Sequence, residues 1–77
     1  MVIHIKRDAY LKLADAAGHQ TIEDRARAAG IGFGTAWRIS TGATESVSAS
    51  TIANLLGTYP ATFYELFEIQ PVVRAAA

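Results

Sequence analysis

The 77-residue chain contains no cysteine, which excludes disulfide bridges and thiolate metal sites and favours a reducing cytoplasm. No apolar run approaches the length that crosses a membrane. The first residues, MVIHIKR, also lack the order of a signal peptide, in which charged residues precede an apolar stretch. We therefore expect one small cytoplasmic domain with no membrane association.

An excess of charge of either sign is also missing. Seven basic and seven acidic residues give a formal net charge of zero. This balance argues against a protein that holds nucleic acid by bulk electrostatics alone, because neutralising phosphates normally supplies much of the affinity. It does not exclude an uneven distribution of charge over the surface.

Catalytic and metal-binding patterns are absent as well. His4 and His19 have no carboxylate at ligand spacing, and the serines lack the partners of a nucleophilic triad. No glycine-rich phosphate loop occurs, since IGFG at 31–34 fits a turn instead. We predict no enzymatic activity, no metal, no cofactor and no small-molecule ligand.

Helical spacing and capping residues predict four or five short helices. Asp8 is a candidate N-cap for the first helix, which Gly18 ends, and Ser48 or Ser50 caps a fourth helix that Gly57 ends. Thr62 and Glu65 form a capping box for a last helix through TFYELFEI, which Pro71 stops. The two central helices are expected at 22–29 and 33–41.

The predicted fold is therefore an all-α, compact domain of four to five helices over residues 7–69. Residues 1–6 form an N-terminal arm or short strand, because VIHI alternates and is β-branched. Residues 70–77 are expected to form a flexible tail.

Small residues between 21 and 42 favour two helices joined by a tight turn. Thr21 caps the first of them, aided by Asp24, and Ala26 lets the two helices cross closely. Gly30 supplies the positive φ that swings the chain. Ile31, Ala36 and Ile39 then form the inner face of the second helix, and Gly42 ends it.

The stretches TIEDRARAAGI and GFGTAWRISTG, followed by IANLLG and ELF, resemble the Cro/C1-type (phage repressor-like) helix-turn-helix proteins. The resemblance covers about Leu11 to Phe67. It implies sequence-specific binding of double-stranded DNA, usually as a homodimer, with helix 33–41 in the major groove. It also implies a setting in a bacterial cell or a phage-infected host.

The resemblance assigns contacts residue by residue. Those expected to face base edges are Phe33, Gly34 and Arg38; Arg38 suits guanine, and Phe33 suits a thymine methyl. Those expected to contact phosphates are Thr35, Trp37 and Thr41, together with the helix start at Thr21 and Ile22.

Two further arginines border this face. Arg25 stands where the family usually has an apolar residue, so it must extend to solvent or pair with Asp24 or another neighbour. Arg25 and Arg27 are candidate phosphate contacts.

The C-terminal helix carries more apolar side chains than one face can bury, which predicts a dimer interface. The arm VIHI could pair across a two-fold axis or onto the PVV segment at 71–73. The interface candidates are Ile3, Ile5, Phe63, Tyr64 and Phe67.

We expect a transcription regulator, Cro-like or a minimal repressor. The alternative is a helix-turn-helix scaffold that binds proteins, such as an anti-repressor or a host-factor inhibitor. An excisionase-like role in bending DNA is a third possibility. Arginines gathered on one face favour DNA, whereas neutralisation of that face by Glu23 and Asp24 favours the protein-binding scaffold.

Overall fold

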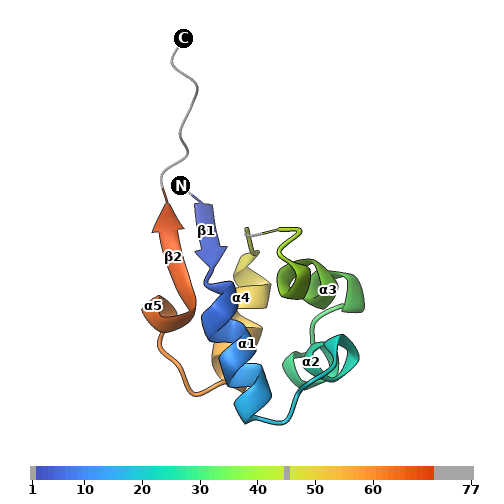
Figure 1. Ribbon diagram of the computed structural model, residues 1–77. Helices are drawn as coiled ribbons and strands as arrows, with labels where there is room; N and C mark the ends of the chain where they lie inside the picture. The colour runs from blue at the N-terminus through green and yellow to red at the C-terminus, as the bar shows by residue number, and fades with distance from the viewer. Residues whose placement is uncertain (1, 45, 71–77) are drawn as a thin grey trace.

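The computed structural model describes residues 2–44 and 46–70, and these form five helices and a two-stranded sheet (Figure 1). In chain order the elements are β1 (Val2–Ile5), α1 (Arg7–Ala16), α2 (Ile22–Ala29), α3 (Phe33–Thr41), α4 (Ala49–Thr58), α5 (Phe63–Leu66) and β2 (Phe67–Gln70). The prediction of four or five helices is confirmed, with five present. The all-α class is wrong, because both ends of the described chain are extended and pair with each other.

The sheet replaces the second half of the expected last helix. The chain is already extended at Phe67, where φ is −135° and ψ is 159°, so α5 is a single turn. β1 and β2 run antiparallel, with Ile3 opposite Ile69 and Ile5 opposite Phe67. The arm therefore pairs with Phe67–Gln70 of its own chain. Its predicted pairing with PVV, and the predicted tail beyond Gln70, lie outside the described residues.

Helix ends follow the sequence signals at most positions. The hydroxyl of Thr21 accepts a hydrogen bond from the Asp24 amide at 3.1 Å, and Thr62 and Glu65 form the reciprocal capping box. Of the two serines proposed to cap α4, Ser48 does so, accepting from the amide of Thr51.

Two predicted helix ends are wrong. Lys6, not Asp8, is the N-cap of α1, because the amide of Lys6 is bound to the carbonyl of Leu66 at 2.7 Å and the helix starts directly after it. Gly57 does not end α4, which continues to Thr58.

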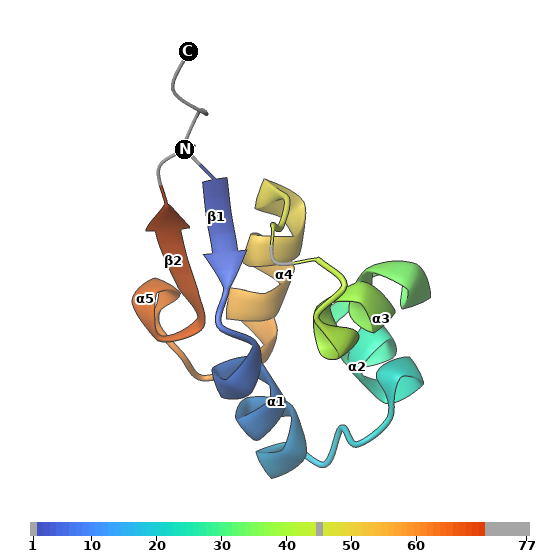
Figure 2. The same cartoon turned by 45° about the horizontal axis from the view of Figure 1, so that its top comes forward.

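The hydrophobic core lies between α1, α4 and the elements on either side of them. Its largest fully buried side chains are Tyr10, Phe67, Ile39, Leu55 and Leu66. Figures 1 and 2 show the sheet and α5 on one side of α1 and α4, and the α2–α3 pair on the other. The sheet thus closes one end of the core and leaves α3 at the opposite surface.

Two glycines provide a matched test of this backbone. Gly30 has φ +67° and Gly57 is helical, and an added Cβ would meet nothing within 4 Å at either site. Gly30→Ala should lower the free energy of unfolding by about 1 kcal/mol, because L-residues are strained in the left-handed region. Gly57→Ala should raise it by about 0.5–1 kcal/mol through helix propensity. Urea denaturation measures both changes, and equal signs would contradict the assigned conformations.

Candidate functional site

The α2–α3 pair is built as the small residues predict. Gly30 adopts the left-handed conformation that ends α2, and the amide of Ile31 donates to the carbonyl of Ala26 at 3.1 Å. Ala36 and Ile39 are fully buried on the inner face of α3, and Ala26 is buried on α2. The opposite face of α3 is consequently left at the surface.

Arg25 fixes the position of this pair from inside the protein. Its side chain is only 11% exposed and lies 3.9 Å from the carboxylate of Asp15. Its Nε donates to the carbonyl of His19 at 3.0 Å, and its two terminal nitrogens donate to the Gln20 carbonyl and the Ser40 hydroxyl, each at 3.3 Å. The expected pairing with a neighbour is confirmed, with Asp15 rather than Asp24. A phosphate contact would require the guanidinium to leave these internal partners.

An aromatic cluster lies beside Arg25. The Tyr59 hydroxyl is 3.0 Å from Nδ1 of His19, and the Tyr10 and Tyr59 rings pack edge to face at 6.0 Å. Burial raises the pKa of Tyr10, and the charge of Arg25 acts in the opposite direction. The cluster joins α4 to the segment between α1 and α2, so His19 has a structural role here.

The outer surface of α3 brings together four predicted contact residues. Phe33 and Trp37, one helical turn apart, are 57% and 46% exposed, and Gly34 and Arg38 are exposed beside them. A terminal nitrogen of Arg38 donates to the Thr35 hydroxyl at 3.4 Å. The surface is therefore an aromatic pair flanked by a guanidinium.

Three further predicted phosphate contacts lie at the end of α3 and the start of α2. The Thr41 hydroxyl is exposed and donates to the Trp37 carbonyl at 2.8 Å, which leaves its oxygen able to accept. Ile22 is half-buried at the start of α2, and Thr21 is exposed with its hydroxyl oxygen engaged in the cap.

A hollow that the motif did not predict lies between α3 and the start of α4. Its volume is about 290 Å³, and it is lined by Thr35, Arg38, Ile39, Thr44, Ser46, Val47, Ser48 and Thr51. Five of these side chains carry hydroxyl groups. The Ser- and Thr-rich run TESVSAST at 44–51 is the sequence feature that could have indicated this hollow. The same residues are equally typical of a loop followed by a helix N-cap.

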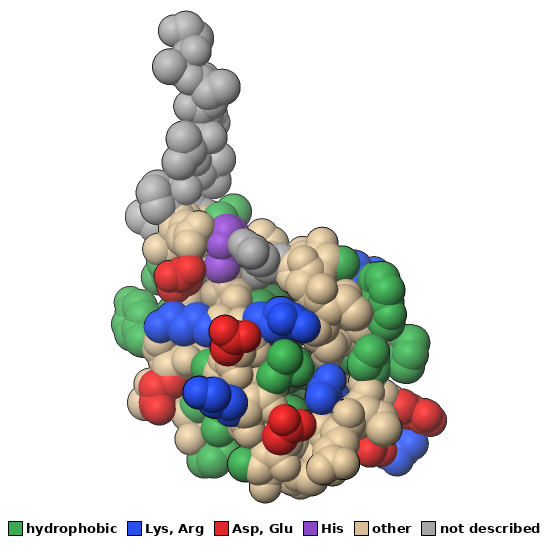
Figure 3. Space-filling model, viewed as in Figure 1, with side chains coloured by type: hydrophobic (Ala, Val, Ile, Leu, Met, Phe, Trp, Pro, Cys, Tyr) green, Lys and Arg blue, Asp and Glu red, His purple; other side chains and the backbone are tan. Residues whose placement is uncertain are grey.

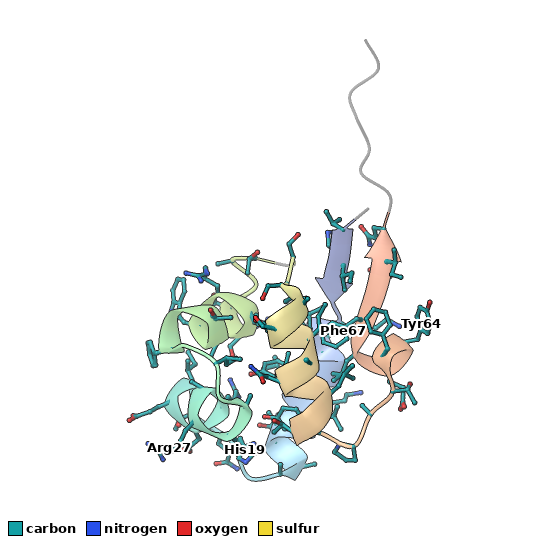
Figure 4. The ribbon with its side chains drawn as sticks, turned by 180° about the vertical axis from the view of Figure 1, so that it is seen from behind. His19, Arg27, Tyr64 and Phe67 are labelled. Carbon is teal, nitrogen blue, oxygen red and sulfur yellow. The ribbon has the colours of Figure 1, made fainter. Side chains whose placement is uncertain are left out.

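The arginines do not form one basic face. Arg27 is exposed at the outer end of α2 (Figure 4), where it lies 3.3 Å from the carboxylate of Glu23 and 3.8 Å from that of Asp24. Figure 3 shows positive and negative side chains interspersed on the face that α1 dominates. Arg27 therefore offers little free charge to a phosphate, and Arg38 is the charged side chain of α3.

The predicted dimer residues fall into two groups. Of the interface candidates, Ile5 and Phe67 belong to the core, and Ile3 and Phe63 are half-buried against it. Tyr64 is 67% exposed and Ile69 is 44% exposed. Figure 4 shows Tyr64 pointing away from the body of the protein and Phe67 lying inside it. Among the described residues of this end of the domain, Tyr64 and Ile69 are the exposed large apolar side chains.

None of the helices within residues 2–44 and 46–70 combines the length and apolar character that crossing a membrane requires. The same residues hold no group of three or more histidine and carboxylate side chains placed to bind a metal ion.

Replacing each arginine of α2 by methionine tests the assignment of their roles. Arg25→Met should lower the free energy of unfolding by about 2 kcal/mol or more, because the hydrogen bonds of a buried cation are lost. Arg27→Met is the matched control and should change it by less than about 0.5 kcal/mol, since exposed ion pairs contribute little. Chemical denaturation followed by circular dichroism gives both values. Similar effects of the two substitutions would contradict the internal role of Arg25.

No protein-family model, curated protein sequence or solved structure matches the chain. The geometry of the α2–α3 pair therefore carries the functional argument alone.

Proposed function

We propose that the protein is a helix-turn-helix transcription regulator of the Cro/C1 kind that binds double-stranded DNA of defined sequence. The observation that carries this proposal is the outer surface of α3, where Phe33, Gly34, Trp37 and Arg38 are exposed while Ala36 and Ile39 anchor the helix from below. A short, outward-facing second helix of this kind suits the width of the major groove.

Within this proposal Arg38 makes the polar base contact. A guanidinium pairs with O6 and N7 of guanine through two hydrogen bonds, and the bond to Thr35 at 3.4 Å restricts the side chain beforehand. Because that bond is long, the side chain can leave Thr35 for a base at little cost.

Phosphate contacts come chiefly from neutral donors. The hollow beside Arg38 supplies hydroxyl groups next to the start of α4. The Thr41 hydroxyl adds no donor while its proton is bound to the Trp37 carbonyl. Arg25 is engaged internally and Arg27 is paired with carboxylates. Few counterions would be released on binding. The affinity should therefore depend on salt concentration less strongly than that of most DNA-binding proteins.

A homodimer on two half-sites is part of the proposal, as for other proteins of this kind. Within the described part of the chain, Tyr64 and Ile69 are the exposed large apolar side chains outside α3, and we assign them to this contact.

The protein-binding scaffold remains the second candidate. It is favoured by the neutralisation of Arg27 by Glu23 and Asp24, which removes one of the two exposed arginines that would otherwise face DNA from the α2–α3 pair. In that case Phe33 and Trp37 would contact a protein partner instead of DNA.

Selection from a randomised duplex library tests DNA recognition. The wild type should enrich one sequence, and Arg38→Ala should weaken binding to that sequence about 10-fold or more and relax the preference at one position. Arg27→Ala, another exposed arginine of the pair, should leave affinity and preference unchanged. Electrophoretic mobility shift and sequencing of the bound pool provide the measurements.

Two results would contradict the proposal. Binding without any enriched sequence would contradict sequence-specific recognition. Equal effects of Arg38→Ala and Arg27→Ala would contradict a base contact by Arg38. If the wild type binds no DNA at all, the second candidate function, a protein-binding scaffold, is favoured.

A further inference from the structure

We infer that Phe33 and Trp37 recognise the 5-methyl groups of thymine in the major groove. This inference rests on the proposed function and names the chemical group that the exposed surface of α3 selects. It assigns Trp37 to a base in place of the phosphate contact that the resemblance implies.

The two rings are placed as a pair. Phe33 is the first residue of α3 and Trp37 follows one turn later on the same face. Four residues rise about 6 Å along a helix, and stacked base pairs are about 3.4 Å apart. Rings on a helix that follows the groove would therefore meet methyl groups about two base-pair steps apart.

Gly34 allows the backbone next to Phe33 to approach the bases closely. A Cβ at this position would have Arg38 as its neighbour, at 3.5 Å, and would project from the exposed surface. Without that Cβ the helix can lie deeper in the groove, which brings the flanking aromatic rings nearer to the base edges.

The base groups exposed in the major groove restrict which base the two rings can contact favourably. Among the groups that the four bases present there, the thymine methyl is the apolar one, and the others donate or accept hydrogen bonds. Covering a donor or acceptor with an aromatic ring removes its water without replacing the hydrogen bond, which is unfavourable. The ring pair thus favours positions that carry a methyl group.

Charge complementarity supports DNA as the occupant of this surface. The segment FGTAWRIST contains one ionisable side chain, the cation of Arg38, and no carboxylate. The N-cap of α3 is Gly32, which has no side chain to bind the first amides of the helix. Both features suit an anionic partner.

The test compares the duplex enriched from the randomised library with the same duplex containing deoxyuridine in place of thymidine. Burying one methyl group corresponds to about a 4-fold gain in affinity, so substitution confined to one half-site, which removes two methyls, should weaken binding about 15-fold. Fluorescence anisotropy at fixed salt measures both dissociation constants. The comparison needs no substitution in the protein, so it does not depend on the folding of a variant.

Variants then assign the effect to residues. Phe33→Ala and Trp37→Ala should each reduce the thymidine-to-deoxyuridine ratio to about 4-fold, since each removes one methyl contact. Arg27→Ala, which removes an exposed side chain of α2 outside the aromatic pair, should leave the ratio unchanged. An unchanged ratio in both α3 variants would overturn the assignment.

A methyl group on cytosine offers the same chemistry, so a third duplex carries 5-methylcytosine at the cytosine positions. Unchanged binding of this duplex supports thymine as the source of the recognised methyl. A gain here without a loss on deoxyuridine would overturn that assignment.

The remaining outcomes separate the two proposals. Equal affinity for thymidine and deoxyuridine duplexes, with the sequence preference intact, would overturn methyl recognition and leave DNA binding standing. Absence of any selected duplex would overturn both.

Discussion

The arrangement of the domain depends on the largely buried guanidinium of Arg25. A charge with so little exposure is tolerated only when its donors are satisfied, and here they bind the carbonyls of His19 and Gln20 and the hydroxyl of Ser40. These partners belong to the α1–α2 connection and to α3. Because one planar group joins both, α3 is held in place from its inner side. Arg7 adds a second link from α1, donating to the Ser40 carbonyl at 2.8 Å.

This internal use of arginine determines what the surface can offer. Arg25 is engaged within the domain and Arg27 is paired on α2, so the exposed face of α3 combines two aromatic rings, one guanidinium and nearby hydroxyl groups. Such a face is suited to recognition by shape, apolar contact and a few directed hydrogen bonds. A domain with zero net charge can act in this way, because its selectivity does not require a large excess of positive charge.

The sequence predicts what is local and leaves out what depends on distant partners. The cap at Thr21, the turn at Gly30 and the inner residues Ala36 and Ile39 follow from short-range spacing and steric limits. The strand at Phe67–Gln70 was not predicted, since FEIQ fits the end of a helix until β1 supplies its hydrogen bonds. Arg25 likewise shows the need for a partner but not its identity, because Asp15 and Ser40 come from other parts of the chain.

We propose that the outer surface of α3 is where the protein meets DNA. Mapping backbone amide chemical shifts as a selected duplex is added tests this claim directly. The account predicts that the largest changes occur along Phe33–Thr41 and around the hollow at the start of α4, with small changes in β1 and β2. Changes confined to the neighbourhood of Tyr64 and Ile69, with α3 unaffected, would contradict it.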